Sequence, residues 1–265
     1  MYSPFKIAQK YLSYYLAASN GKGHGIHSPF VFDFVVNVLN DQRDFYAYSQ
    51  IENLRQKLLL DANTIEVEDL GAGSSVSKTK QRKVCDIAKH AAKNKKLAQL
   101  LFRIANYYQP KNIIELGTSL GISSLYLASA NPGSSLSTIE GSSPIAEIAK
   151  NNFQLLGLKN IQSITGNFDD VLTDVLKNKK TIDLAFIDGN HRKEPTIKYF
   201  EQLLEHSTTS SIFIFDDIHW SKEMEDAWSI IKTSERVTLS IDLFFIGLVF
   251  FRKDFKAKQD FIIRF

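Results

Sequence analysis

The stretch that decides the fold is IIELGTSLG, which runs from Ile113 to Gly121. It begins with apolar residues typical of a buried strand, passes through the acidic residue Glu115, and ends in a turn that contains two glycines. Because glycine has no side chain, such a turn lets a ligand approach the backbone closely. The stretch therefore predicts a strand, a ligand-binding turn and a helix in succession.

From residue 112 onward, short apolar runs alternate with amphipathic stretches, a pattern that predicts a parallel sheet covered by helices on both faces. The predicted strands cover 113–116, 136–139, 161–165, 182–187 and 212–215, and the predicted helices cover 123–130, 144–156, 168–176, 194–205 and 222–232. Two further apolar runs, 237–243 and 245–251, are so close that we expect a hairpin or an adjacent antiparallel pair. The expected fold is α/β, a doubly wound, mostly parallel seven-stranded sheet of the Rossmann-like type with an antiparallel last strand.

Residues 1–109 have a different, mostly helical pattern, so we expect a helical N-terminal region or cap followed by the α/β domain at 110–265. Helices are predicted near 5–16 and 29–39, the second with Ser28 as its cap. The Lys- and Arg-rich stretch 78–96 is interpreted as one helix with a solvated face rather than an anion-binding patch. His24 and His27 lie in a glycine-rich segment that we interpret as a surface turn, with a lid over the active site as the alternative.

The composition indicates a globular protein, since 44% of the 265 residues are hydrophobic and can form a sizeable core. Lys and Arg number 32 against 29 for Asp and Glu, a net charge of +3 that is too small to indicate a nucleic-acid partner. The single cysteine, Cys85, cannot form an intramolecular disulfide. We find no signal peptide in 1–18, and the apolar run 243–251 is too short to span a bilayer, so we expect a cytoplasmic protein without a membrane partner.

A second acidic residue, Glu140, ends the predicted strand that follows the glycine turn. A carboxylate at this position, 23 residues after Gly117, can accept hydrogen bonds from both ribose hydroxyls of a bound nucleoside. The two glycines Gly117 and Gly121 are spaced G-x-x-x-G, whereas dinucleotide enzymes normally show G-x-G-x-x-G. The pattern thus favours an adenosine-type cofactor over NAD.

Together, the Glu115–Gly121 stretch and Glu140 resemble motif I and its acidic partner in the class I S-adenosylmethionine (SAM) methyltransferases. The resemblance covers residues 112–251 and implies SAM as the cofactor. It also implies that the glycine turn holds the methionine end of SAM, that Glu140 holds the ribose, and that Asn167 and Phe168 flank the adenine. The cofactor-binding set that we derive is Glu115, Gly117, Ser119, Gly121, Ser123, Glu140, Gly141, Asn167, Phe168 and Asp188.

A similar-looking stretch, EVEDLGAGS from Glu66 to Ser74, also combines acids with glycines. The Lys-rich helical segment follows it, and no strand that ends in an acid comes next. We therefore interpret it as a structural turn or a wall near the site.

Polar residues follow the fourth and fifth predicted strands: Asp188 and His191 after the fourth, and Asp216 and Asp217 after the fifth. In the usual strand order of this fold these strands are neighbours, with carboxyl ends about 5 Å apart. Converging carboxylates repel one another unless a cation lies among them, and Mg²⁺ prefers such oxygen ligands. The neutral imidazole of His191 could take a proton from a substrate hydroxyl.

These residues are similar to those of the magnesium-dependent macrocin-type sugar O-methyltransferases and, more loosely, of the catechol-type enzymes. The resemblance implies Asp188, Asp216 and Asp217 as metal ligands and His191, three residues after Asp188, as the catalytic base. This chain departs from the pattern by having Asp-Asp where Glu-Asp is expected. The alternative is a site without metal, in which Asp188 orients the amino group of the cofactor and Asp216 caps a turn.

The expected function is SAM-dependent methylation of a small-molecule hydroxyl, an activity of the EC 2.1.1 class. Two alternatives stay open: a metal-independent N-methyltransferase, and a cofactor-binding module that has lost its chemistry. The identity of the acceptor and the assembly state, a homodimer included, cannot be read from the sequence.

Overall fold

The predicted alternation of strands and helices is present in the computed structural model, which describes residues 1–67 and 81–265. Within these residues eight strands form a mostly parallel sheet, which confirms the α/β class and adds one strand to the seven predicted. The chain divides into two compact units, one made of residues 1–41 and 179–265 and the other of residues 42–178. The division into 1–109 and 110–265 stays a prediction.

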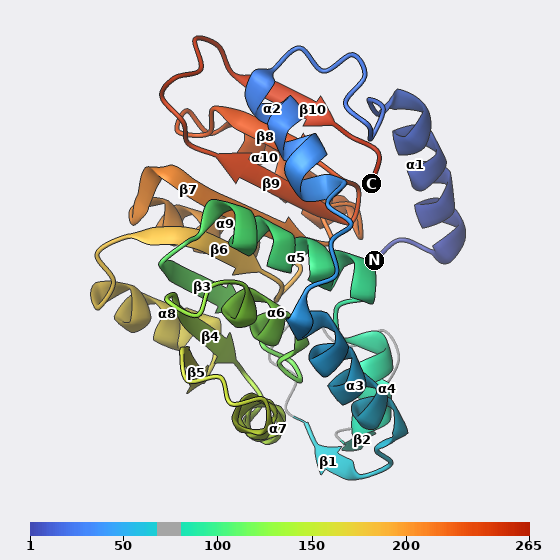
Figure 1. The fold of residues 1–265 in the computed structure, drawn as a ribbon, viewed down its shortest axis with the longest axis vertical. Coiled ribbons are helices and arrows are strands. Elements are labelled where there is room, and N and C mark those ends of the chain that lie inside the picture. The colour runs from blue at the N-terminus through green and yellow to red at the C-terminus, as the bar shows by residue number, and fades with distance from the viewer. Residues whose placement is uncertain (68–80) are drawn as a thin grey trace. The chain divides into compact units, whose positions relative to one another are not determined.

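The unit 42–178 contains three parallel strands in the order β3-β4-β5, in which Leu116 is level with Ile139 and Glu140 is level with Thr165. Helices α6, α7 and α8 follow these strands in turn (Figure 1). The elements of the unit are α3 (Tyr46–Leu60), β1 (Thr64–Glu66), β2 (Gln81–Lys83), α4 (Val84–His90), α5 (Lys95–Tyr108), β3 (Asn112–Leu116), α6 (Ile122–Ala130), β4 (Ser135–Glu140), α7 (Ser143–Leu155), β5 (Ile161–Thr165) and α8 (Phe168–Lys177).

The single helix predicted for 78–96 is wrong over its described part. Residues 81–83 form β2, which pairs antiparallel with β1, and α4 then ends at His90. A separate helix, α5, begins after Asn94, whose side chain accepts a hydrogen bond from the amide of Leu97. This capping bond favours a new helix start because it satisfies an amide that has no partner within the helix. Residues 68–74 of the second glycine stretch lie outside the described residues.

The unit formed by 1–41 and 179–265 contains five strands in the order β10-β8-β9-β7-β6. Strand β9 runs antiparallel to both β7 and β8, as the paired apolar runs predicted, whereas β6 and β7 are parallel. The elements are α1 (Pro4–Ala17), α2 (Pro29–Phe34), the π-helix η1 (Val35–Leu39), β6 (Ile182–Ile187), α9 (Lys193–Leu204), β7 (Ser207–Asp216), α10 (Lys222–Thr233), β8 (Leu239–Asp242), β9 (Ile246–Phe250) and β10 (Gln259–Ile262).

Two details of this unit differ from the predictions. The additional strand, β10, pairs parallel with β8 at the end of the strand order. The helix predicted for 29–39 changes from α to π geometry after Phe34, and the hydroxyl of Ser28 makes no capping bond. Its carbonyl oxygen instead accepts from the amide of Phe32, at 2.8 Å between N and O.

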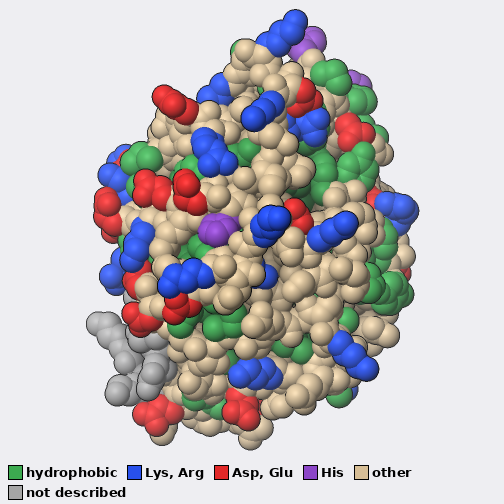
Figure 2. Space-filling view, turned by 90° about the vertical axis from the view of Figure 1, so that its left-hand side faces the viewer, with side chains coloured by type: hydrophobic (Ala, Val, Ile, Leu, Met, Phe, Trp, Pro, Cys, Tyr) green, Lys and Arg blue, Asp and Glu red, His purple; other side chains and the backbone are tan. Residues whose placement is uncertain are grey.

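No helix among the described residues has the length and apolar character needed to cross a bilayer. On the face of the molecule that Figure 2 displays, basic and acidic side chains are interspersed rather than segregated by sign. This distribution agrees with the nearly balanced charge of the sequence.

Candidate active site

The glycine turn between β3 and α6 has an unusual backbone. Gly117 and Gly121 have φ angles of 102° and 84°, and Ser119 between them has a φ of 48°. Positive φ angles cost little for glycine but are uncommon for serine. The amides of Gly117 and Thr118 both donate to the carbonyl oxygen of Ile139, at 3.0 and 3.2 Å, so the turn is tied to the end of β4.

Glu140 links this turn to the loop that follows β4. Its Oε2 atom accepts from the amide of Ser119 at 2.8 Å, and its Oε1 atom accepts from the amide of Ser142 at 3.0 Å. The hydroxyl oxygens of Ser119 and Ser142 are themselves buried and have no hydrogen-bond partner among the described residues. Buried hydroxyls usually have partners, so a carboxylate flanked by two such hydroxyls fits a ligand rich in hydrogen-bonding groups.

Glu115 faces the interior rather than the surface. Its side chain is fully buried, and its Oε2 atom accepts from the Thr138 hydroxyl at 2.6 Å and from the Ser124 hydroxyl. These bonds tie β3 to β4 and α6, the elements that flank the glycine turn. In this structure Glu115 therefore braces the turn from the inside.

Five of the other predicted cofactor residues follow the carboxyl ends of the same three strands, and Asp188 instead follows β6. Gly121 is also needed for packing, because a Cβ atom there would lie 2.5 Å from the Cε1 atom of Phe153. Gly141 lies between Glu140 and Ser142, and Ser123 is buried in the first turn of α6. Asn167 caps α8 by accepting from the amide of Asp169, and Phe168 begins that helix half-buried.

The second predicted group comes together at the ends of β6 and β7. Ligand atoms of Asp188, His191 and Asp216 all lie within 4.8 Å of one another. They converge because Ile187 is level with Phe215 in the two parallel strands, so Asp216 at the end of β7 and the residues after β6 lie at the same edge of the sheet. Two carboxylates and one imidazole are a donor set that suits a divalent cation.

Asp217 does not belong to this three-residue group. Its φ of 53° turns the chain sharply after Asp216, and its amide donates to the carbonyl oxygen of Phe245 at 2.7 Å. His191 lies 3.6 Å from Asp188, measured from Nε2 to Oδ1, and its ring is 5.6 Å from that of Trp220 between centroids. The structure thus brings His191 to the two carboxylates more closely than it does Asp217.

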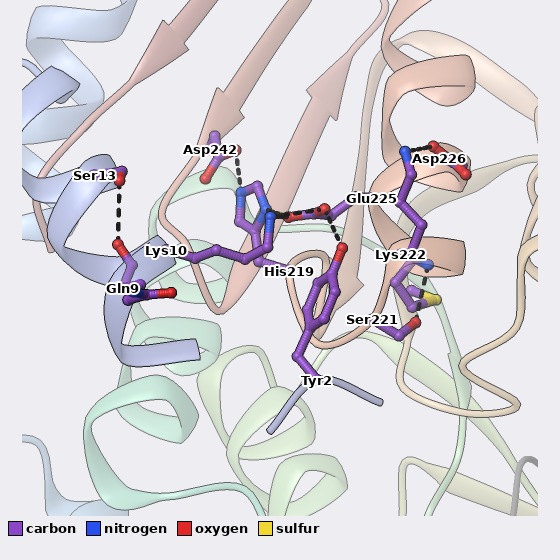
Figure 3. A network of polar contacts seen from close by, with 11 residues as sticks. Tyr2, Gln9, Lys10, Ser13, His219, Ser221, Lys222, Glu225, Asp226 and Asp242 are labelled. Carbon is purple, nitrogen blue, oxygen red and sulfur yellow. Dashed lines mark hydrogen bonds and ion pairs between the residues drawn. The ribbon is translucent and has the colours of Figure 1, made fainter. Parts of the chain in front are cut away.

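A half-buried histidine, His219, was not predicted to have a role. Its Nδ1 lies 3.1 Å from a Glu225 oxygen and its Nε2 lies 2.8 Å from an Asp242 oxygen (Figure 3). Its ring stacks on that of Phe244 at 5.1 Å between centroids. Burial by itself favours the neutral ring, but the hydrogen bonds and charges of the two carboxylates prevail and hold the pKa of His219 above its usual value. Because both ring nitrogens face carboxylate oxygens, this arrangement favours the doubly protonated imidazole, which can donate to both.

The same network attaches the N-terminal segment to the loop after β7. Glu225 accepts from the Tyr2 hydroxyl at 2.8 Å and pairs with the Lys10 ammonium at 2.8 Å, and the Tyr2 amide donates to the Trp220 carbonyl oxygen at 2.9 Å (Figure 3). Burial raises the pKa of Glu225, but its donors Lys10, Tyr2 and His219 outweigh this effect and lower it. No local sequence pattern links residues 2 and 225, so only their packing reveals the network.

Comparison with known proteins shows what the segment that carries these residues is similar to. Residues 114–218 match the family model described as a methyltransferase domain. The match runs from β3 to the loop after β7, so it includes the glycine turn, Glu140 and the Asp188 group. It confirms the resemblance inferred from the sequence.

A curated relative, the catechol O-methyltransferase of Niastella koreensis, is 32% identical over 126 residues, which are 46% of this chain and 55% of that protein. The chain thus matches only about half the length of this relative.

Solved structures show the same fold. The O-methyltransferase TomG of Streptomyces achromogenes, solved with SAM, has a TM-score of 0.57 and 18% identity over 84% of this chain and 95% of its own. The Bacillus cereus O-methyltransferase, solved with SAH, has a TM-score of 0.54 and 20% identity over 80% and 93%. The Podospora anserina methyltransferase PaMTH1, also bound to SAH, has a TM-score of 0.59 and 13% identity over 85% and 97%.

Proposed function

We propose that this protein is a SAM-dependent methyltransferase that methylates a hydroxyl oxygen of a small molecule. The observation that carries the proposal is the glycine turn joined to Glu140 through the Ser119 amide, within a segment that matches a methyltransferase domain. This hydrogen bond holds the carboxylate against the turn, and such preorganisation favours tight nucleoside binding.

In the cofactor site, Glu140 would accept hydrogen bonds from the ribose hydroxyls, and the Ser119 and Ser142 hydroxyls would bind polar groups nearby. The methionine end of SAM would be held by the glycine turn and the residues beside it, Gly117, Gly121, Ser123 and Gly141. Glu115 would brace this turn. Asn167 and Phe168 would flank the adenine. When bound, SAM supplies a methyl group that its positively charged sulfur activates for attack by a nucleophile.

In the second site, Asp188 and Asp216 would hold Mg²⁺. Asp188 is also kept as a cofactor-binding residue, as the sequence predicts. Asp217 is a weaker candidate ligand, because it does not belong to the converging group. His191 would take the proton of the acceptor hydroxyl onto a ring nitrogen, so that the oxygen gains the methyl group as it loses hydrogen. Mg²⁺ prefers oxygen ligands, whereas an imidazole ligand suits a transition metal better. With Mg²⁺ in the site, His191 would therefore act as the base rather than as a metal ligand.

The acceptor is proposed to be a small molecule, because the matching curated relative is a catechol O-methyltransferase. The converging carboxylates and imidazole favour O-methylation over a metal-independent N-methyltransferase, which would not need them. We also propose a cytoplasmic location, because the single cysteine leaves no intramolecular disulfide that would call for an oxidising compartment.

The experiment incubates the full chain with SAM, Mg²⁺ and 3,4-dihydroxybenzoate, a simple catechol, and measures SAH and methylated product by mass spectrometry. SAH that forms only with the catechol, together with product, would support the proposal. SAM binding in calorimetry without turnover on this acceptor, or on a panel of hydroxylated and amine compounds, would favour the cofactor-binding module instead. Absence of SAM binding would overturn the cofactor assignment.

A further inference from the structure

Helix α1 has an inward apolar face that is already occupied. Ile7, Tyr14 and Ala18 follow one another at spacings of seven and four, so they share one side of the helix at 3.6 residues per turn. Tyr14 and Ala18 are buried together with Phe244, and Ile7 packs against this cluster. The inward face thus accounts for the attachment of α1 to its own unit.

A second apolar face points away from the protein. Phe5, Leu12 and Leu16 repeat the same spacings of seven and four, offset by two residues, which is about 200° around the helix. They are 73%, 60% and 72% exposed. An α-helix at the surface normally carries polar residues on the side opposite its buried stripe, so this outward stripe requires an explanation.

Rotation of α1 cannot bury the outward stripe. The Tyr14 hydroxyl donates to the carbonyl oxygen of Ile263, and Lys10 pairs with Glu225 at 2.8 Å on the inward side (Figure 3). The Tyr2 hydroxyl, just before the helix, donates to the same carboxylate. Turning the helix would break these contacts and expose Tyr14, so the outward stripe is a fixed feature of the surface.

The apolar surface around the stripe is large. Its exposed members are Met1, Phe5, Tyr11, Leu12, Tyr15, Leu16 and Phe245. Tyr11 joins the stripe to the body of the unit, since its ring lies 6.5 Å from Tyr15 and 6.0 Å from Phe245 between centroids. At about 200 Å² for a large side chain, the exposed fractions of these residues come to roughly 780 Å². A standard stable interface buries about 800 Å² on each partner, so this surface is close to what one half of a dimer needs.

We propose that this outward face of α1, the α1 surface, binds a second copy of the chain, with the two α1 helices antiparallel across a twofold axis. In a register centred between residues 10 and 11, Phe5 lies against the partner's Leu16, and Gln9 lies against the partner's Leu12. No two like charges meet across the helix pair in this register. The surface is therefore self-complementary, as a twofold interface requires.

A membrane surface fits this face less well than a second copy. Interfacial helices carry several basic residues beside the apolar face to bind anionic lipids. Helix α1 has only Lys6 and Lys10, and Lys10 is paired with Glu225. The electrostatic attraction would thus rest on a single helix residue.

Sedimentation velocity of the full chain, from low to high micromolar concentration, tests the proposal. The wild type should sediment as a dimer, and Leu12→Glu should sediment as a monomer with an unchanged far-UV circular-dichroism spectrum, which shows that the variant is folded. The matched control is Leu60→Glu on α3, because Leu60 is 84% exposed and lies outside the α1 surface; this variant should stay dimeric. A monomeric wild type at all concentrations, or a Leu12→Glu variant as dimeric as the wild type, would overturn the proposal.

Disulfide trapping tests the register and separates it from lipid binding. In a Cys85→Ser background, the double variant F5C/L16C should form an interchain disulfide on mild oxidation, and F5C alone should not. Efficient cross-linking of F5C alone would overturn the antiparallel register. Cosedimentation of a monomeric wild type with phosphatidylserine vesicles, lost in Leu12→Glu, would assign the α1 surface to membranes and overturn the dimer.

Discussion

Replacing Glu140 with alanine should weaken SAM binding by about 2–3 kcal/mol, which is about 30- to 150-fold in Kd. A hydrogen bond to a charged group contributes about 1.5–3 kcal/mol, and water entering the shortened site would offset part of the loss of two such bonds to the ribose. The Ser119 and Ser142 amides would also lose their acceptor, so the melting temperature should fall as well. Isothermal titration calorimetry with SAM and with SAH, beside thermal denaturation without ligand, measures the two effects separately.

Glu140→Gln separates charge from shape, because the amide keeps one oxygen acceptor of nearly the same geometry. Its SAM affinity should lie between those of the wild type and Glu140→Ala. Glu147→Ala is the matched control, since Glu147 is an exposed glutamate on α7 of the same unit, and it should bind SAM as the wild type does. Unchanged affinity for both SAM and SAH in Glu140→Ala would refute the ribose assignment.

Three further predictions concern the other unit. His191→Ala should cut turnover by about two to four orders of magnitude, the usual contribution of a positioned base, while SAM affinity in calorimetry stays near the wild-type value; comparable loss of both would assign His191 to binding. A chelator should abolish turnover and Mg²⁺ should restore it, whereas Asp216→Asn should need far more Mg²⁺; turnover indifferent to chelator would remove the metal from the mechanism. The raised pKa of His219 means that the folded state binds its proton more tightly than the unfolded chain, so this stabilisation is complete below pH about 6.5 and is lost as the pH rises through the folded value. Urea denaturation between pH 6 and 9 should therefore show a falling free energy of unfolding that His219→Gln flattens, and equal slopes for both proteins would contradict the imidazolium between Asp242 and Glu225.

The sequence by itself determined the alternation of strands and helices and the position of the ligand-binding turn. Local patterns sufficed because buried parallel strands are nearly continuous apolar runs, and because a glycine turn after such a run has few other uses. Asp188 and Asp216 could be expected to converge for the same reason, since Asp188 follows β6, Asp216 ends β7, and the carboxyl ends of neighbouring parallel strands share an edge. Each of these inferences depends on residues that are close in the chain or on a general rule of sheet geometry.

Only the tertiary structure decided which way individual side chains point. Glu115 turns inward because the hydroxyls of Thr138 and Ser124 lie across the neighbouring elements. Asp216 lies close to His191, whereas its chemically identical neighbour Asp217 does not belong to the group. The positive φ of Asp217 turns the chain at this point. No pattern of residue types distinguishes such orientations.

The structure also decided every feature that joins distant parts of the chain. Strand β10 is short and half-exposed, with little apolar signal of its own, and it is a strand because its backbone pairs with β8. His219 is held by Glu225 and Asp242, and Lys10 reaches Glu225 across 215 residues of sequence. Such contacts form when packing brings their backbones together, and the pairing energy depends on distance and burial rather than on sequence separation. Local sequence patterns thus predict the helices and strands and where they end, but they do not predict which side chains those elements contact.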